Sequence, residues 1–373
     1  MNLRELCVSS AEEFSIQPLT FKVSNSRRAS QRLLRVLPAL LLLLVAVVAQ
    51  SQRYTKIVVF GDSLSDTGND FVLFSDIGFP FPAPYILPPP NPPFILNYTL
   101  AHFTDGSDTT PSATSYHGVW IEQMAAALPS HPAVIASQWG GTNYAYGYGN
   151  TFNGTTTFNL FDSITVNVEN VGMQIDDYLA THPAIDKNTL VVFWAGANNL
   201  TEAVGEPNAP QLIINGAIAQ VGNIQRLINA GATQFLVLSV PNLGAVPRFN
   251  SSPTDSAAFK QASILFNATL DTGVSLLPIL NFGRHLTIQR LDVFSVMNNI
   301  VAHPGNYGFV NATDSSQGEP VDPDTFLFWD DLHPTTHGHN ILSQAALKAV
   351  EPPGCLIPVS PGEYVGSGAP GCR

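Results

Sequence analysis

Short apolar runs rich in β-branched residues alternate along this chain with longer segments of helical periodicity. The apolar runs lie at residues 55–60, 189–195, 233–240 and 286–294. Helical spacing of apolar residues is found at 119–128, 164–180, 211–230, 255–282 and 336–350. Strands that alternate with helices of this length pair in parallel, because each helix returns the chain across the sheet. The sequence therefore predicts an α/β fold with a parallel sheet and helices on both faces.

The charge of the chain is distributed unevenly. The first 49 residues carry a net charge of +3, and the remainder carries −15. An acidic body repels the phosphates of nucleic acids, so we expect no nucleic-acid partner. With 45% apolar residues the chain can bury a large core, and its charged share of only 12% is typical of an extracellular protein with long ordered loops.

A basic stretch at residues 27–35 precedes an apolar run at 37–49, and polar residues follow. This order is typical of a secretory signal, with cleavage expected after Ala49. An uncleaved anchor is the alternative, but the run is shorter than the roughly 20 residues that span a bilayer, so we expect no stable membrane anchor. The expected organisation is an N-terminal extension with a signal peptide (1–49), one catalytic domain (53–350) and a Pro/Gly-rich tail (351–373), secreted to the extracellular space.

Secretion also predicts oxidised cysteines and glycans. After cleavage only Cys355 and Cys372 remain, and we expect a disulfide between them, with free thiols as the alternative. The sequence contains six Asn-X-Ser/Thr sequons. Five are glycosylation candidates: Asn97, Asn153, Asn250, Asn267 and Asn311.

Polar motifs follow the first strand and precede the last helix. Ser63 lies in FGDSLSDTGN directly after the first strand, where ligands of such sheets bind. Asp330 and His333 lie in WDDLHPT, at a spacing that can place carboxylate and imidazole side by side. A serine with such a pair can act as a nucleophile. Taken singly, each motif is more typical of a turn or a helix cap.

Two further turns can supply donors for an oxyanion, which needs more than one. Asn198 lies in GANN after the second strand, and Gly147 lies in NYAYG. The cluster His333, His337 and His339 lacks the spacing of a zinc site, and the aspartates after Asp62 lack that of a calcium loop, so we expect no metal and no cofactor.

The four blocks in this order resemble the GDSL esterases and lipases, or SGNH hydrolases, over nearly all of residues 55–345. The chain most resembles the secreted fungal and plant-type members, and the fungal ones include carbohydrate acetyl esterases. The resemblance implies a flavodoxin-like three-layer α/β/α sandwich. It also implies a triad of Ser63, Asp330 and His333, and an oxyanion hole formed by Ser63, Gly147 and Asn198.

The chain departs from the family pattern at three points. Asn199 stands where the family usually has Asp, and although it forms a sequon we expect it to stay unmodified beside the site. Gly149 competes with Gly147 as the donor. Asp331 competes with Asp330, and the three-residue spacing to His333 favours Asp330.

The resemblance implies a secreted serine ester hydrolase. An acetyl esterase acting on hemicellulose-derived saccharides is our first expectation. A lipase or lysophospholipase acting on longer acyl chains is the alternative, and a catalytically silent carbohydrate-binding or surface protein is the alternative of another class. The expected partner is an acetylated saccharide or a lipid-like ester, the expected state is a monomer, and the Pro-rich loop region at 74–116 is expected to be functional.

Overall fold

The computed structural model describes residues 54–76, 102–105, 118–160, 164–360, 362–369 and 372, which all belong to one compact unit. The predicted leader, Asn97 and most of the Pro-rich loop region lie outside the described residues.

The centre of the fold is a parallel sheet of four strands in the order β1-β4-β5-β6. Its strands are β1 (Lys56–Gly61), β4 (Thr189–Trp194), β5 (Gln234–Leu238) and β6 (Thr287–Leu291). At the edge of β1 that does not face β4, Asn143 forms an isolated parallel β-bridge with Val59. The segment around Asn143 therefore occupies the place of a fifth strand. The resulting order matches the flavodoxin-like 2-1-3-4-5 arrangement. The predicted fold class is confirmed.

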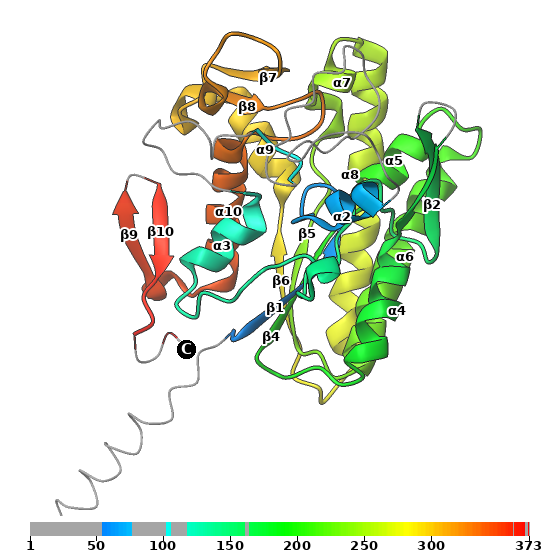
Figure 1. The fold of residues 1–373 in the computed structure, drawn as a ribbon, viewed down its shortest axis with the longest axis vertical. Coiled ribbons are helices and arrows are strands. Elements are labelled where there is room, and N and C mark those ends of the chain that lie inside the picture. Colours follow the sequence, from blue (N-terminus) through cyan, green and yellow to red (C-terminus); the bar gives the residue numbers. More distant parts are fainter. Residues whose placement is uncertain are drawn as a thin grey trace, which may run out of the picture. The chain divides into compact units, whose positions relative to one another are not determined.

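Side chains alternate between the two faces of the sheet, so each face carries its own apolar core. Helices lie on both sides of the sheet (Figure 1). Val58 and Phe60 of β1 lie in one core, which α4 (Val171–Thr181), α6 (Ala209–Asn229) and α8 (Pro253–Leu280) cover. Ile57 and Val59 lie in the other, which α3 (Trp120–Ala127) and α10 (Thr336–Val350) cover. Both faces of the sheet are therefore buried beneath helices.

The helix predicted over 164–180 is wrong in its first part. Residues Ile164–Glu169 form strand β3, which pairs antiparallel with β2 (Thr155–Leu160), and the helix α4 begins only at Val171. Val166 and Val168 are buried, whereas Thr165 and Asn167 between them are exposed. This alternation has the period of a strand, and the valines also fit a helical spacing when counted with the residues that follow.

The strand predicted over 286–294 is too long, because β6 ends at Leu291. The side chain of Asp292 accepts a hydrogen bond from the backbone N–H of Ser295 and starts α9 (Val293–Ala302). The remaining elements near the site are short: α2 (Asn69–Asp76), α5 (Ala197–Ala203), α7 (Pro247–Asn250), β7 (Asn311–Ser315) and β8 (Phe326–Phe328).

The Pro/Gly-rich tail forms an antiparallel hairpin of β9 (Leu356–Ser360) and β10 (Glu363–Gly366). Its Tyr364 packs on the core beside α10, and Lys348 of α10 lies 4.5 Å from the centre of the Tyr364 ring. A disulfide joins Cys355 and Cys372. The hairpin is thus attached to the domain by packing and closed by the disulfide.

Among the described helices, α8 is long and apolar enough to cross a membrane by length and composition. One of its faces contributes Phe259, Phe266 and Leu270 to the core shared with α6 and the sheet. Such burial is also typical of the central helix of a globular domain.

The asparagines of the described sequons differ in the hydrogen bonds that their side-chain amides make. Asn153 is exposed. The Nδ2 of Asn267 donates to the carbonyl of Val240 at 2.8 Å, and its Oδ1 accepts the N–H of the same residue at 2.8 Å. The Nδ2 of Asn250 donates to two backbone carbonyls, and that of Asn311 donates to Asp314 at 2.7 Å. A glycan at Asn267 would displace the hydrogen bonds that hold the end of β5.

Candidate active site

Ser63 occupies a tight turn at the carboxyl end of β1. The Oδ1 atom of Asp62 accepts the backbone N–H of Leu64 at 3.1 Å, and the carbonyl of Asp62 accepts that of Ser65 at 3.0 Å. The N–H of Asp62 in turn donates to Trp194 at the end of β4. The turn is therefore held by its own sequence and by the neighbouring strand, and it carries Ser63 above the edge of the sheet.

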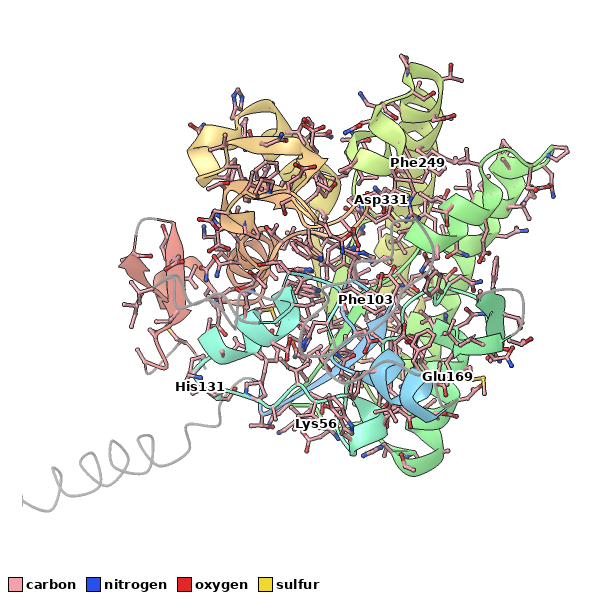
Figure 2. All side chains as sticks on the ribbon, turned by 45° about the horizontal axis from the view of Figure 1, so that its top comes forward. Lys56, Phe103, His131, Glu169, Phe249 and Asp331 are labelled. Atoms are coloured by element: carbon pink, nitrogen blue, oxygen red, sulfur yellow. A yellow bond between two sulfur atoms is a disulfide. The ribbon has the colours of Figure 1, made fainter. Side chains whose placement is uncertain are left out.

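Asp330 organises the second turn. Its Oδ1 accepts the backbone N–H groups of Leu332 and His333 at 2.7 and 2.6 Å, and its Oδ2 lies 2.8 Å from Nδ1 of His333. The rival Asp331 forms a salt bridge with Arg248 at 2.8 Å, and Figure 2 shows Asp331 next to Phe249 of α7. Of the two acids, Asp330 is the one that the structure brings to His333.

The two turns meet although 270 residues separate them. Nε2 of His333 lies 2.8 Å from Oγ of Ser63. Asp330 and His333 are both buried. A carboxylate at Nδ1 fixes the tautomer in which Nε2 carries the lone pair, so this nitrogen can take the hydroxyl proton of the serine. The arrangement is the one that an activated serine nucleophile requires.

Phe103 covers this pair from the side. Its ring centre lies 5.2 Å from that of His333, and the labelled Phe103 lies near the centre of Figure 2. Neighbouring Thr104 donates its hydroxyl to the carbonyl of Pro334 at 2.9 Å. The described part of the Pro-rich loop region therefore contacts the turn that carries His333 directly.

The predicted oxyanion donors lie at the same edge. The N–H of Tyr146 donates to Gly61 at 3.4 Å, which places Gly147 beside the turn of Ser63. Within the described residues, no hydrogen bond is found for the N–H of Ser63, and the N–H of Gly147 lies near the carboxyl of Asp70. The amide of Asn198 donates one proton to the carbonyl of Gly149 at 3.0 Å and retains a second. Gly149 thus serves as an anchor for Asn198.

Asn199, which stands where the family usually has an aspartate, can make the hydrogen bond that holds the neighbouring loop. Its Oδ1 accepts the backbone N–H of Thr151 at 3.0 Å, a bond that an amide oxygen makes as well as a carboxylate does. The side chain is only 3% exposed. Because attachment of a glycan needs an accessible amide, we continue to expect that this sequon stays unmodified.

An apolar pocket opens beside Ser63 and His333. Besides Ser63 and His333, its polar lining residues are Asp62, Asn198 and Thr201. Most of the remaining lining is apolar and includes Trp194, Leu243, Val246, Val293, Met297, Ile300, Leu327, Phe328 and Leu342. The sequence did not predict this pocket, because the pocket needs α9, whose first two residues were predicted as the end of a strand and whose remainder was not predicted as an element. The Asp-Ser signal at 292–295 is the cap that would have marked the helix.

Burial changes the acid–base properties of two groups around the site. It raises the pKa of Asp62 to about 7, against the opposing effects of the Leu64 N–H and of His333. It lowers the pKa of His339 to about 3, and Nδ1 of His339 accepts the N–H of Trp120 at 3.2 Å. His339 is therefore neutral and structural, at the join between α10 and α3.

The histidine cluster does not converge. Nδ1 of His337 lies 2.6 Å from the carbonyl of Asp324, whereas His333 and His339 have the partners given above. Among the described residues there is no group of three or more His, Cys, Asp or Glu that could hold a metal ion.

A serine, a histidine and a carboxylate connected in this order at the carboxyl edge of a parallel sheet define the serine hydrolase class. The model of the GDSL-like lipase/acylhydrolase family matches residues 57–346, and the chain belongs to this family.

Two curated relatives indicate the range within the family. Lipase 1 of Photorhabdus luminescens is 26% identical over 85% of this chain, and an acetylesterase of Thermothelomyces thermophilus is 27% identical over 43% of it. The chain spans about half the length of each, 53% and 52%. A crystal structure of a lipolytic G-D-S-L family protein from Veillonella parvula aligns with 79% of this chain and 97% of its own, at 12% identity and a TM-score of 0.39.

Proposed function

We propose that this chain hydrolyses carboxylic esters with Ser63 as the nucleophile. The observation that carries the proposal is the continuous hydrogen-bonded path from Asp330 through His333 to Ser63, with 2.8 Å at each step. The family membership supports the same chemistry.

The reaction proceeds in two steps of acyl transfer. Oγ of Ser63 forms a bond to the carbonyl carbon of the ester while its proton passes to Nε2 of His333. The N–H groups of Ser63 and Gly147 and the amide of Asn198 stabilise the negative oxygen of the tetrahedral intermediate. The bond to the alcohol then breaks, and His333 returns the proton to the leaving oxygen. Water repeats the sequence on the acyl-enzyme, releases the acid and restores Ser63.

The acyl group of the substrate has several carbons in this proposal. The lining of the pocket beside Ser63 is largely apolar, and an acyl chain of several carbons would contact side chains such as those of Val246, Met297 and Ile300, which a two-carbon acetyl group would contact less. Each methylene moved from water into such a lining contributes about 0.8 kcal/mol to binding. The pocket thus favours the lipase-type alternative over the acetyl esterase of our first expectation.

Removal of acetyl groups from hemicellulose-derived saccharides is the second candidate. Trp139 is 52% exposed, and its ring lies against Gly68 in the loop that follows Ser63. An exposed indole beside a catalytic loop can stack on a sugar ring. The similarity to an acetylesterase agrees with this candidate.

Secretion, the absence of a stable membrane anchor and a monomeric state belong to the proposal as well. The signal-like order of basic, apolar and polar residues at 27–52 supports secretion. The disulfide between Cys355 and Cys372 agrees with an oxidising compartment.

The test is a series of initial rates on p-nitrophenyl acetate, butyrate, octanoate and palmitate. Ser63→Ala is measured alongside, and Ser65→Ala is the matched control from the same turn, since Ser65 points away to the indole N–H of Trp120. We expect the highest kcat/KM on butyrate or octanoate and loss of turnover in Ser63→Ala only.

A maximum on acetate, together with acetate release from acetylated xylan, would transfer the proposal to the second candidate. Equal turnover by the wild type and Ser63→Ala would refute the nucleophile. A protein that hydrolyses none of the four esters would instead fit the silent carbohydrate-binding or surface protein.

A further inference from the structure

Asp70 is a buried acid that the mechanism above does not use. It lies in the first turn of α2 and is 0% exposed, and neither of its carboxyl oxygens has a hydrogen-bond partner within the described residues. Burial without a counter-charge disfavours a carboxylate relative to the neutral acid. Burial accordingly raises the pKa of Asp70 well above its usual value, which favours the neutral acid.

The carboxyl of Asp70 lies directly against Gly147. A side-chain carbon at Gly147 would lie 2.3 Å from Oδ2 of Asp70 and 2.6 Å from the ring of Phe103. Only glycine fits between these two groups, and Phe103 in turn contacts His333. The N–H of Gly147 lowers the pKa of Asp70, so it interacts more favourably with the carboxylate than with the neutral acid.

Asp66 decides the order in which the two acids ionise. Its carboxylate accepts three backbone N–H groups, from Gly68 at 2.8 Å, Asn69 at 2.7 Å and Asp70 at 3.0 Å. These bonds oppose the effect of burial, which raises the pKa of Asp66 to about 6. The negative charge of Asp66 then raises the pKa of Asp70 further. The pair therefore titrates in two steps, with Asp66 first.

The other titratable groups around the pair do not neutralise Asp70. His102 faces Asp66 and lowers its pKa. The hydroxyls of Tyr146 and Tyr148 face Asp70 across the Gly147 segment, and burial raises the pKa of both, so they remain neutral. The ring of His333 contacts that of Phe103, with 5.2 Å between the ring centres.

We propose that Asp70 is a positioning residue that controls whether Gly147 is available to the reaction. As a neutral acid, Asp70 leaves the N–H of Gly147 to the oxyanion of the substrate. As a carboxylate, it attracts that N–H and places a negative charge behind the oxyanion. This inference rests on the proposed ester hydrolysis, and it implies that turnover falls as pH rises through the ionisation of Asp70.

The experiment is the pH profile of kcat/KM on p-nitrophenyl butyrate from about pH 5 to about pH 10. We expect the wild type to lose about 10²-fold on the alkaline side, the loss typical of one oxyanion donor. Asp70→Asn, which carries no charge at any pH, has no such decline. In Asp66→Asn the decline moves to lower pH, because the like charge that raises the pKa of Asp70 is absent. Asp176→Asn is the control, because Asp176 is a half-exposed acid that pairs with Arg226. We expect its pH profile to be the same as that of the wild type.

An alkaline decline that survives in Asp70→Asn, or a wild type without one, overturns the inference while leaving ester hydrolysis intact. A wild type inactive on every ester overturns the proposed function and this inference together. Circular dichroism verifies that each variant is folded. If Asp66→Asn does not fold, the comparison of the pH profiles of the wild type and Asp70→Asn is sufficient to test the inference. A purely structural role for Asp70 would lower activity equally at all pH values.

Discussion

Replacing Asp62 by Asn should make the protein more stable at alkaline pH than the wild type. Asp62 is 2% exposed, its Oδ2 has no hydrogen-bond partner in the described structure, and burial raises its pKa from 3.8 to about 7. Because the pKa is raised in the folded state, this contribution to stability is complete below pH 4 and is lost as pH rises to about 7. At about 1.4 kcal/mol per pKa unit, the loss is roughly 4 kcal/mol.

The assay is urea unfolding of the wild type and Asp62→Asn at several pH values. The amide of Asn retains the acceptor for the N–H of Leu64 but cannot ionise, so the difference between the two proteins isolates the carboxyl. We expect the stability of Asp62→Asn relative to the wild type to increase by up to about 4 kcal/mol from pH 4 to pH 8. Other titrating groups cancel in this difference, and Asp176→Asn is the control. If the free energies of unfolding of the wild type and Asp62→Asn changed with pH in parallel, the reasoning would be refuted.

Three further outcomes follow from the site and the surface. Asn198→Ala should lower kcat by about 10²–10³-fold with little change in KM, because its amide acts on the oxyanion, and steady-state kinetics on p-nitrophenyl butyrate measure this. Met297→Trp should fill part of the pocket and shift the preferred ester toward acetate, whereas an unchanged chain-length profile would place the acyl group elsewhere. In protein secreted from a eukaryotic host, Asn153→Gln should reduce the mass by one glycan and Asn267→Gln should not, because the amide of Asn267 is bonded on both sides to Val240.

The sheet could be predicted from the sequence because its pattern is local. Each of the strands β1, β4 and β5 is a short run of buried apolar residues, and both of its faces need the same kind of side chain. The region of β3 was predicted wrongly for the opposite reason. Its buried valines satisfy the period of a strand and that of a helix, and only the pairing with β2, outside the local sequence, selects the strand.

The catalytic residues could be predicted because each of their two motifs forms a self-contained turn. Asp330 holds His333 through bonds that span only three residues, and Asp62 holds the turn of Ser63 through bonds that span two and three. The pocket could not be predicted in this way. Val246, Met297 and Ile300 are ordinary apolar residues, and their meeting depends on where α7 and α9 pack.

The meeting of the two catalytic turns requires contacts that neither motif contains. Thr104 donates to the carbonyl of Pro334, and the carboxyl of Asp105 accepts the N–H of Thr336, so the segment 102–105 holds the start of α10 on both sides of Thr335. The hydroxyl of Thr335 accepts the N–H of Gly338 and caps the helix. Phe103, in the same segment, contacts the imidazole ring of His333. A loop that lies more than 200 residues earlier in the sequence therefore helps to orient the ring of the proposed base. The geometry of the nucleophile and its base is therefore a property of three segments, of which the two with a recognisable motif supply the reacting groups and the third supplies their alignment.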